Sequence, residues 1–353
     1  MDAGVEAPEV LTRVENGVGR ITLNRPKALH ALTLGMCDAM ATALREWEKD
    51  PSVQVVMLDH AEGTRGFCAG GDIRMVAQSG RTDGRAADDF FRVEYTLNTQ
   101  IKRFTKPFVA ILDGITMGGG VGISVHGSHR VATERTIFAM PETGIGLFPD
   151  VGGGWFLPRL DGELGTWLAL TGAQLRGADV LVAGIATHYV ASEEMADLKA
   201  EILADPGSAD VIISRRSRPA PEPSFAPYID VMNRCFAGGS MAEIVSGLNA
   251  DGSEWAIKQA EILTKRSPLS MSVALKQLRQ GREMASFEDV MRMEYRVACH
   301  ITRTNDFSEG VRAVIEDKDN APKWQPETIE AVVPSMIEHM FDGLGSAELQ
   351  LPN

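Results

Sequence analysis

The sequence contains little that would suggest disulfides, a membrane span or nucleic-acid binding. Its four cysteines, in 353 residues, form no CxxC pair and have no metal-ligand spacing, which favours thiols in a reducing compartment. No run of about 18 apolar residues occurs, so no membrane-spanning helix is expected. The net charge is −13, from 35 basic and 48 acidic residues. This charge argues against a general nucleic-acid binder, because such a protein needs a basic surface.

The amino terminus also lacks the features of a targeting segment. MDAGVEAPEV is acidic and has no apolar centre, unlike a signal peptide or an Arg-rich transit peptide. We therefore expect a cytoplasmic protein. An anionic small ligand remains compatible with the acidic charge, because a few local cations and backbone N–H groups suffice to bind it.

The beginning of the chain predicts a hairpin followed by a helix. The β-rich segments Val10–Glu15 and Val18–Leu23 flank Asn16-Gly17, a dipeptide typical of hairpin turns. Thr33 is placed to cap a helix that extends through about Lys49. Its apolar residues recur at helical spacing and define one face: Leu34, Cys37, Met40, Leu44 and Trp47.

Further strands and helices alternate before a glycine-rich segment. Strands are expected at Val53–Leu58 and Phe108–Leu112, with a helix near Ala86–Phe104 between them, and this alternation predicts an α/β layered core. The segment 114–154 then holds 11 of the chain's 35 glycines in 41 residues. Such density indicates sharp turns or close backbone approach. Because the segment is also strongly apolar, we expect it to be buried.

The character of the chain changes after Ser214. The stretch Arg215–Pro227 has four prolines after a basic cluster, which is typical of a linker. Helical patterns follow it, at Met241–Leu248, Glu254–Lys265, Met271–Gln280, Phe287–Thr302, Phe307–Glu316 and Pro334–Phe341. We therefore divide the chain into a core, 1–221, and a helical carboxyl-terminal region, 222–353.

Two glycine-rich turns, Gly66–Ile73 and Gly114–Gly122, are the first candidates for chemistry. The second leads from a strand into an expected helix at Val121–His126, where free N–H groups favour negative charge. One N–H from each turn could form an oxyanion hole for a thioester carbonyl; two tight packing turns are the alternative. The turns match no dinucleotide loop, P-loop or nucleophile elbow. Packing is expected for the nearby Ser124, His126, Ser128 and His129.

Two acids stand in an apolar setting in the sequence MPETGIGLFPDVGGG. These are Glu142 and Asp150. Isolated carboxylates among such residues are costly unless they are paired or functional, and burial raises a carboxyl pKa into a range that suits acid–base catalysis. The alternatives are an ion pair, for example with Arg159, and for Asp150 a cap on a helix at Gly152–Leu157. For Glu142 we favour function.

At this point the motifs carry a family resemblance. FCAGGDI, GITMGGGVGIS and FAMPETGIGLFPDVGGG, in this order, resemble the crotonase (enoyl-CoA hydratase/isomerase) superfamily, and most closely its 3-hydroxyisobutyryl-CoA hydrolase branch. Leu23–Thr33 looks like the family's CoA-binding amino-terminal stretch, and Phe307–Trp324 resembles its carboxyl-terminal motif. The resemblance implies a crotonase (ClpP-like) spiral of ββα units with a helical carboxyl-terminal region.

The resemblance also implies roles for individual residues. It places the oxyanion-hole N–H groups at Gly71 and Gly119 and a catalytic glutamate at Glu142. Asp150 matches the second acid of the hydrolase branch, and Glu94 matches its substrate-contacting glutamate. Glu94, Gly119, Glu142 and Asp150 are thus the expected substrate-binding residues. Lys318 is a candidate for the CoA phosphates, with a solvated surface lysine as the favoured alternative.

Two positions separate this chain from the hydratases that it resembles. Hydratases typically carry a second catalytic glutamate two residues beyond the glycine triplet, where this chain has Gly122, and commonly have glycine in place of Asp150. Both differences point away from the addition of water to a double bond. The resemblance to the hydrolase branch implies hydrolysis of a short-chain 3-hydroxyacyl-CoA, with 3-hydroxyisobutyryl-CoA as the expected substrate and Glu142 as base or nucleophile. The alternatives are an enoyl-CoA hydratase or isomerase and a non-catalytic acyl-CoA-binding protein.

The resemblance further implies the ligands and partners. We expect an acyl-CoA substrate, no metal or redox cofactor, no nucleic acid and no membrane, and we leave a homo-oligomer open. CoA is part of the substrate rather than a cofactor. Valine catabolism is the implied pathway.

Overall fold

The structure is a computed structural model that describes residues 7–351. The chain forms two compact units that interleave along the sequence. The first contains Met1–Gly71, Gln100–Ile137 and Arg176–Pro221, and the second contains Asp72–Thr99, Phe138–Leu175 and Glu222–Asn353. The last crossing between units falls at the expected division, but earlier segments of the chain also belong to the second unit. The assignment of 1–221 as the acyl-CoA-binding core stays a prediction.

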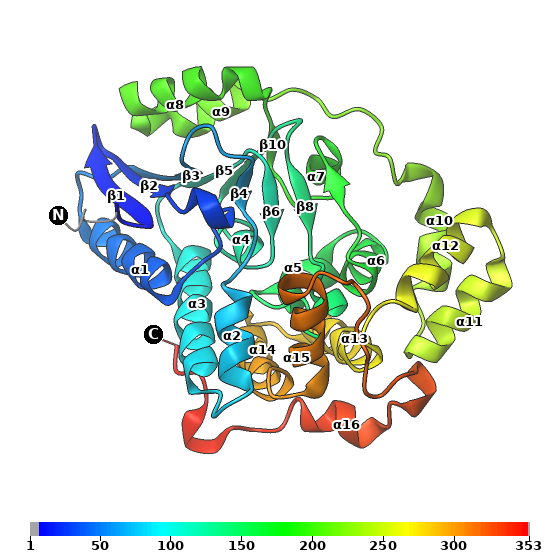
Figure 1. Ribbon diagram of the computed structural model, residues 1–353. Helices are drawn as coiled ribbons and strands as arrows, with labels where there is room; N and C mark the ends of the chain where they lie inside the picture. The colour runs from blue at the N-terminus through cyan, green and yellow to red at the C-terminus, as the bar shows by residue number, and fades with distance from the viewer. Residues whose placement is uncertain (1–6, 352–353) are drawn as a thin grey trace. The chain divides into compact units, whose positions relative to one another are not determined.

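The first unit is built on a six-stranded sheet (Figure 1) with the order β1-β2-β3-β5-β7-β10. Only β1 and β2 are antiparallel, and the other neighbours are parallel. The strands are β1 (Val10–Glu15), β2 (Val18–Leu23), β3 (Val55–His60), β5 (Phe108–Leu112), β7 (His129–Ala132) and β10 (His188–Tyr189). Every residue of β5 is buried, as expected for a central strand that is covered on both faces.

The hairpin and the first helix form where the sequence predicts them. Asn16 and Gly17 both have positive φ, 50° and 82°, the conformation that a tight hairpin turn needs. Helix α1 (Leu34–Lys49) begins after Thr33, whose hydroxyl accepts a hydrogen bond from the N–H of Met36. Such a cap contributes about 1 kcal/mol. The expected apolar face is buried except at Leu34, which is 38% exposed. Leu34 is the first residue of the helix, so it lies at the end of this apolar face.

Two helices cover the sheet of the first unit (Figure 1). These are α8 (Met195–Ala204) and α9 (Ala209–Arg216). Their apolar side chains form one buried cluster with strand residues such as Val55, Met57, Val109 and Ile111. Because α9 continues to Arg216, the expected linker is shorter than predicted, and residues 217–225 lie outside helices and strands. Within that stretch Phe225 is buried.

A second, parallel strand pair lies in the first unit. It consists of β4 (Gly66–Cys68) and β6 (Ile115–Met117), in which Gly66 pairs with Ile115 and Cys68 with Thr116. Helix α4 (Gly119–Gly122) follows β6 directly. The helix expected at Val121–His126 therefore starts earlier and ends sooner. The remaining short elements in the middle of the chain are β8 (Ile137–Ala139), β9 (Leu175–Arg176) and α7 (Asp179–Val182).

The second unit is helical. It contains α2 (Ile73–Gly80), most of α3 (Arg85–Arg103), α5 (Gly153–Phe156), α6 (Leu164–Thr171), α10 (Ile229–Cys235), α11 (Met241–Asp251), α12 (Glu254–Leu263), α13 (Pro268–Glu283), α14 (Phe287–Ile301), α15 (Asn305–Val311) and α16 (Pro334–His339). Serine or threonine side chains cap α11 to α15 at their first turns. The carboxyl-terminal helices predicted from the sequence are thus confirmed. Helices α13 and α14 contact α5, which contains part of the glycine-rich segment (Figure 1).

Candidate active site

The two glycine-rich turns of the first unit lie next to each other. Each follows one strand of the parallel pair β4 and β6, at the carboxyl end of the strand. A Cβ atom added at Gly70 would lie 3.9 Å from the backbone nitrogen of Gly119, and one added at Gly120 would lie 2.3 Å from the carbonyl oxygen of Cys68. The second distance is shorter than any normal contact, so only glycine fits at position 120. Glycine thus allows the two turns to approach closely.

Both predicted oxyanion donors retain an available N–H group. Among residues 7–351 neither Gly71 nor Gly119 donates a backbone hydrogen bond. The turn before Gly71 is instead held by its neighbours, because the N–H of Leu32 donates to the Gly70 carbonyl and the N–H of Ala69 donates to the Leu29 carbonyl. Gly119 is the first residue of α4, where an N–H has no partner within the helix. These two groups can therefore donate to an oxygen that becomes anionic.

The second unit brings the three predicted acids into electrostatic contact. Glu94 lies on α3, Glu142 begins a 3₁₀ turn after Pro141, and Asp150 precedes α5. Their exposed fractions are 2%, 4% and 5%. Within residues 7–351 none of the three forms an ion pair, and the expected alternative partner Arg159 donates instead to backbone carbonyls. The acids are thus buried without a compensating cation.

Burial raises the pKa of all three groups, and repulsion from neighbouring carboxylates adds to this effect in Glu94 and Glu142. Burial, followed by the charges of Asp150 and Glu142, raises the pKa of Glu94 well above its ordinary value. Burial, followed by the charge of Asp150, does the same to the pKa of Glu142. Burial raises the pKa of Asp150 to about 6, and a hydrogen bond from Tyr95 opposes this rise. Carboxyl groups with raised pKa values can exchange protons near neutrality, as acid–base catalysis requires.

Tyr95 is the direct partner of Asp150. Its hydroxyl donates to Asp150 Oδ2 over 2.7 Å, and both side chains are buried. Helix α5 begins at Gly153 without a side-chain cap from Asp150. The alternative that Asp150 caps the following helix is therefore wrong, because the carboxylate points to the tyrosine instead.

Several buried polar atoms near these acids lack any hydrogen-bond partner. They are Glu94 Oε1, Glu142 Oε2 and both amide atoms of Asn98. Asn98 lies four residues after Glu94 and three after Tyr95 on α3, a spacing that places it on the same helical face. Leaving buried polar groups unpaired is costly, so this face of α3 is a candidate surface for a polar ligand.

Reasoning from the sequence missed Tyr95, Asn98, Gln277 and Glu294. Glu294 accepts hydrogen bonds from the backbone N–H groups of Gly152 and Gly154, and Gln277 donates to the carbonyl of Pro149. One signal was present, because Glu294 stands on the apolar face of α14 among buried residues such as Met291 and Val297. A carboxylate on such a face is costly unless it is bonded. Its two glycine partners, however, are more than 100 positions away in the chain.

The Tyr95–Asp150 bond leads to a test by pH. We expect Tyr95→Phe to move the Asp150-dependent limb of the pH–rate profile to higher pH. The reason is that the tyrosine hydroxyl lowers the pKa of Asp150, so its loss lets burial raise that pKa further. The sign holds whether Asp150 works as an acid or as a base. The measurement is kcat against pH. Tyr228→Phe, on α10's amino-terminal side, is the matched control and should leave the limb in place; an unmoved limb in Tyr95→Phe contradicts the expectation.

The other polar candidates have structural partners. The hydroxyl of Ser124 donates to carbonyl oxygens of α4, and Ser128 bonds to the backbone of Phe108. His129 lies between Ser128 and Asp210, with ring-nitrogen distances of 3.0 and 3.1 Å. Because the Ser128 hydroxyl already forms hydrogen bonds with the backbone of Phe108 on β5, it is not available as a nucleophile. Lys318 is exposed and has a positive φ of 60°; its contact with CoA stays a prediction.

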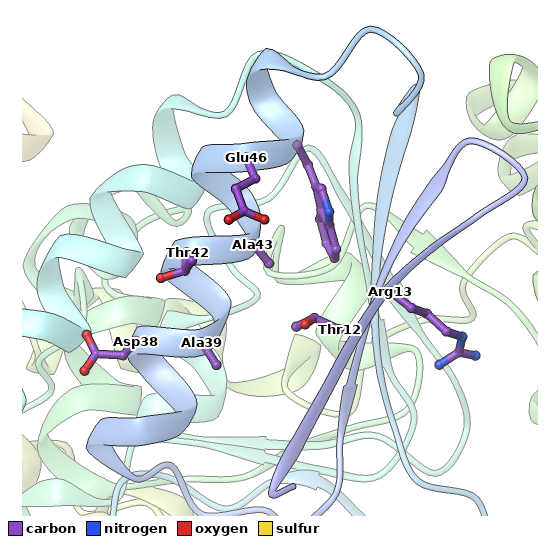
Figure 2. Close-up of a pocket in the computed structure, with 8 residues that line it drawn as sticks. Thr12, Arg13, Asp38, Ala39, Thr42, Ala43 and Glu46 are labelled. Atoms are coloured by element: carbon purple, nitrogen blue, oxygen red, sulfur yellow. The ribbon is translucent and has the colours of Figure 1, made fainter.

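A groove in the first unit contains none of the predicted site residues (Figure 2). Its volume is about 460 Å³. Figure 2 shows Asp38, Thr42 and Glu46 along α1 on one side and Thr12 on β1 on the other.

Within residues 7–351 no helix is long and apolar enough to cross a membrane. Over the same residues no group of three or more His, Cys, Asp or Glu side chains could hold a metal ion.

Comparison with known proteins identifies relatives over nearly the whole chain. The family model for enoyl-CoA hydratase/isomerase matches residues 18–341. A Xenopus laevis protein named "3-hydroxyisobutyryl-CoA hydrolase, mitochondrial" is 50% identical over 342 residues, which cover 94% of this chain and 88% of that protein. Eight curated relatives, 44–50% identical, carry this same name. Because each of them is named as mitochondrial, the cytoplasmic location expected from the sequence is contradicted.

Two solved structures have the same fold over almost their full length. One, titled a carnitinyl-CoA dehydratase from Mycobacterium thermoresistibile, has a TM-score of 0.93 and 42% identity, and the match covers 98% of this chain and 99% of that one. The other, titled an enoyl-CoA hydratase from Rhodobacter sphaeroides 2.4.1, has a TM-score of 0.90 and 39% identity, covering 98% and 100%. The chain therefore belongs to the enoyl-CoA hydratase/isomerase family and has the crotonase fold.

Proposed function

We propose that this protein hydrolyses 3-hydroxyisobutyryl-CoA to the free acid and CoA. The observation that carries the proposal is the pair of buried acids, Glu142 and Asp150, in a chain that is 50% identical to a protein named for this hydrolysis. Both acids have raised pKa values, and an ordinary hydrophobic core would not retain them. Valine catabolism and a homo-oligomer stay predictions.

In the proposed mechanism two backbone N–H groups are the oxyanion donors. The N–H groups of Gly71 and Gly119 donate to the thioester oxygen, which becomes anionic when the carbonyl carbon is attacked. Donors that are held in place before the reaction stabilise this charge without reorganisation, and a single one typically contributes about 10²–10³-fold to the rate. Within residues 7–351 no backbone carbonyl accepts a hydrogen bond from either N–H group, which supports this role.

Three carboxyl groups are the acid–base and binding groups of the proposed mechanism. Glu142 activates a water molecule, or attacks the carbonyl itself to form a transient anhydride that water then opens. Both routes require its ionised carboxylate. Asp150 holds the substrate hydroxyl or helps to protonate the leaving thiolate, and Glu94 orients the acyl group. The unpartnered Oε1 of Glu94 and Oε2 of Glu142 support a role in binding or catalysis.

A hydratase or dehydratase is the second candidate. The titles of the two similar solved structures favour it. Gly122 argues against it, because glycine offers no side chain to transfer a proton at the position where hydratases typically carry a glutamate. The buried acids, which form no ion pair within residues 7–351, also argue against a protein that only binds acyl-CoA, since binding alone needs no acid–base groups. No metal or redox cofactor enters the proposed steps.

The proposal is tested by the products. Wild-type protein should release free thiol from 3-hydroxyisobutyryl-CoA, and the free acid should appear in equal amount. A thiol reagent follows the first product and mass spectrometry the second. Binding of the acyl-CoA without either product would contradict hydrolysis and support the binding protein.

A further inference from the structure

The chain adopts a strained backbone directly after Asp150. Val151 has a positive φ of 52°, and Gly152 follows with 86°. The left-handed region is disfavoured for L-residues and most of all for a β-branched one such as valine. Such a conformation persists only where the surrounding structure imposes it, and it concentrates at functional sites. Contacts from neighbouring elements must therefore hold the turn 149–154 in this conformation.

Two side chains from the carboxyl-terminal helices hold this turn on both sides of Asp150. Glu294, on α14, accepts the N–H of Gly152 on Oε2 at 2.7 Å and the N–H of Gly154 on Oε1 at 2.8 Å. Gln277, on α13, donates its amide to the carbonyl of Pro149 at 2.7 Å. The same Nε2 also donates to Glu294 Oε1 at 3.0 Å. The two side chains thus form one connected clamp.

The packing around the clamp depends on glycine at two positions. A Cβ atom at Gly154 would lie 3.1 Å from atoms of both Gln277 and Glu294. A Cβ atom at Gly281, on α13, would lie 2.0 Å from the carbonyl oxygen of Gly154. Gln277 and Glu294 are themselves fully buried. Glycine at these two positions therefore permits the close approach of the turn to α13 and α14.

We propose that Glu294, acting with Gln277, is a positioning residue that fixes the strained turn and thereby aims the Asp150 carboxylate. The proposal rests on the hydrolysis proposed above and adds residues to which no role in it has been given. Tyr95 fixes the Asp150 side chain from α3, and the clamp fixes its backbone. Together they hold the carboxylate from two directions.

The chemistry of Glu294 suits a clamp better than that of a glutamine would. Three N–H donors meet its two oxygens, and only a carboxylate can accept on both oxygens. Burial raises the pKa of Glu294 to about 8, while the bonds from Gly152, Gly154 and Gln277 favour the ionised form, so the full clamp is present above about pH 8. In Glu294→Gln the amide NH₂ must face at least one of these donors. The turn should then lose one of its anchors while the side-chain volume is kept.

A purely structural anchor of α5 is the rival explanation, and a double-mutant cycle separates the two. The variants are Glu294→Gln, Asp150→Asn and their combination. We expect Glu294→Gln alone to lower kcat for CoA release by roughly ten-fold to 10²-fold, the scale of a small misplacement of a reacting group. KM should change by less than about three-fold, and in the Asp150→Asn background the same substitution should cost less than about two-fold in kcat.

Two further substitutions of buried glutamines serve as controls for the cycle. Gln277→Met removes the donor to Pro149 and leaves both glycine bonds of Glu294, so it should show a smaller kcat loss with the same dependence on Asp150. It also serves if Glu294→Gln does not fold. Gln259→Met replaces another buried glutamine, which bonds to Trp167, and should lower the melting temperature without changing kcat. An equal kcat loss for Glu294→Gln in both backgrounds, or none in either, overturns the proposal.

Hydrogen exchange tests the clamp independently of the reaction. The amides of Gly152 and Gly154 should be protected in the wild-type protein and should exchange at least ten-fold faster in Glu294→Gln. Unchanged exchange shows that no clamp exists, whatever the activity. If the wild-type protein releases no CoA, the proposed function fails by itself, and the cycle is then measured on the hydration of crotonyl-CoA.

Discussion

Glu142→Gln is expected to lower kcat for CoA release by at least about 10²–10⁴-fold, the usual contribution of a positioned general base. The substitution keeps the side-chain volume and removes the basicity. Water activation needs a base at this position and anhydride formation needs a carboxylate, so both routes fail with an amide. The measurement is thiol release from 3-hydroxyisobutyryl-CoA by purified protein.

The substitution should leave binding and folding largely intact. Glu142 Oε2 has no hydrogen-bond partner, and the charge of Glu142 opposes those of Glu94 and Asp150. Because the amide removes this repulsion, the melting temperature should stay constant or rise. KM should change less than kcat, since the CoA portion and the glycine N–H groups remain. A folded variant within a few-fold of wild-type activity rules out the assignment and makes Asp150 or Glu94 the central acid.

Gly119→Pro should have the second largest effect, a loss of about 10²–10³-fold in kcat, because it removes one oxyanion donor. Proline has no N–H but is compatible with the first position of a helix, and Gly119 is the first residue of α4. Thiol release measures the loss, and circular dichroism with the melting temperature verifies the fold.

Gly119→Ala is the matched control for this substitution. It adds a Cβ atom but retains the N–H group, so it should remain far more active than the proline variant. The difference between the two variants, rather than either loss alone, reports the oxyanion donor. If the folded proline variant is within a few-fold of the alanine variant, the N–H of Gly119 has no part in the reaction.

Local signals made much of the fold predictable. The Asn16-Gly17 turn and the Thr33 cap lie where the sequence placed them, because each depends on residues only a few positions apart. The end of α4 was harder to predict, since glycine disfavours helices and the helix stops at Gly122. The interleaving of the two units could not be predicted either. It depends on which segments of the chain pack together, and no local pattern encodes this.

Some residues of the candidate site could be recognised from the sequence, and others only from the fold. Glu142 and Asp150 were recognisable because they are carboxylates in an apolar segment, and the family resemblance added Glu94. The structure confirms that all three are buried, while their roles stay predictions. The bond from Tyr95 to Asp150 and the clamp formed by Glu294 join residues that are distant in the sequence. Such contacts arise from tertiary packing, so they appear only when the fold is known.

A comparison of substrates distinguishes the proposed hydrolysis from hydration. Wild-type protein is given 3-hydroxyisobutyryl-CoA, 3-hydroxypropionyl-CoA or crotonyl-CoA, while free thiol and the enone absorbance are followed together. Because Gly122 supplies no second acid, we expect thiol release from the 3-hydroxyacyl-CoA substrates and a persistent crotonyl-CoA absorbance. Rapid loss of that absorbance without thiol release would show instead that the protein is a hydratase.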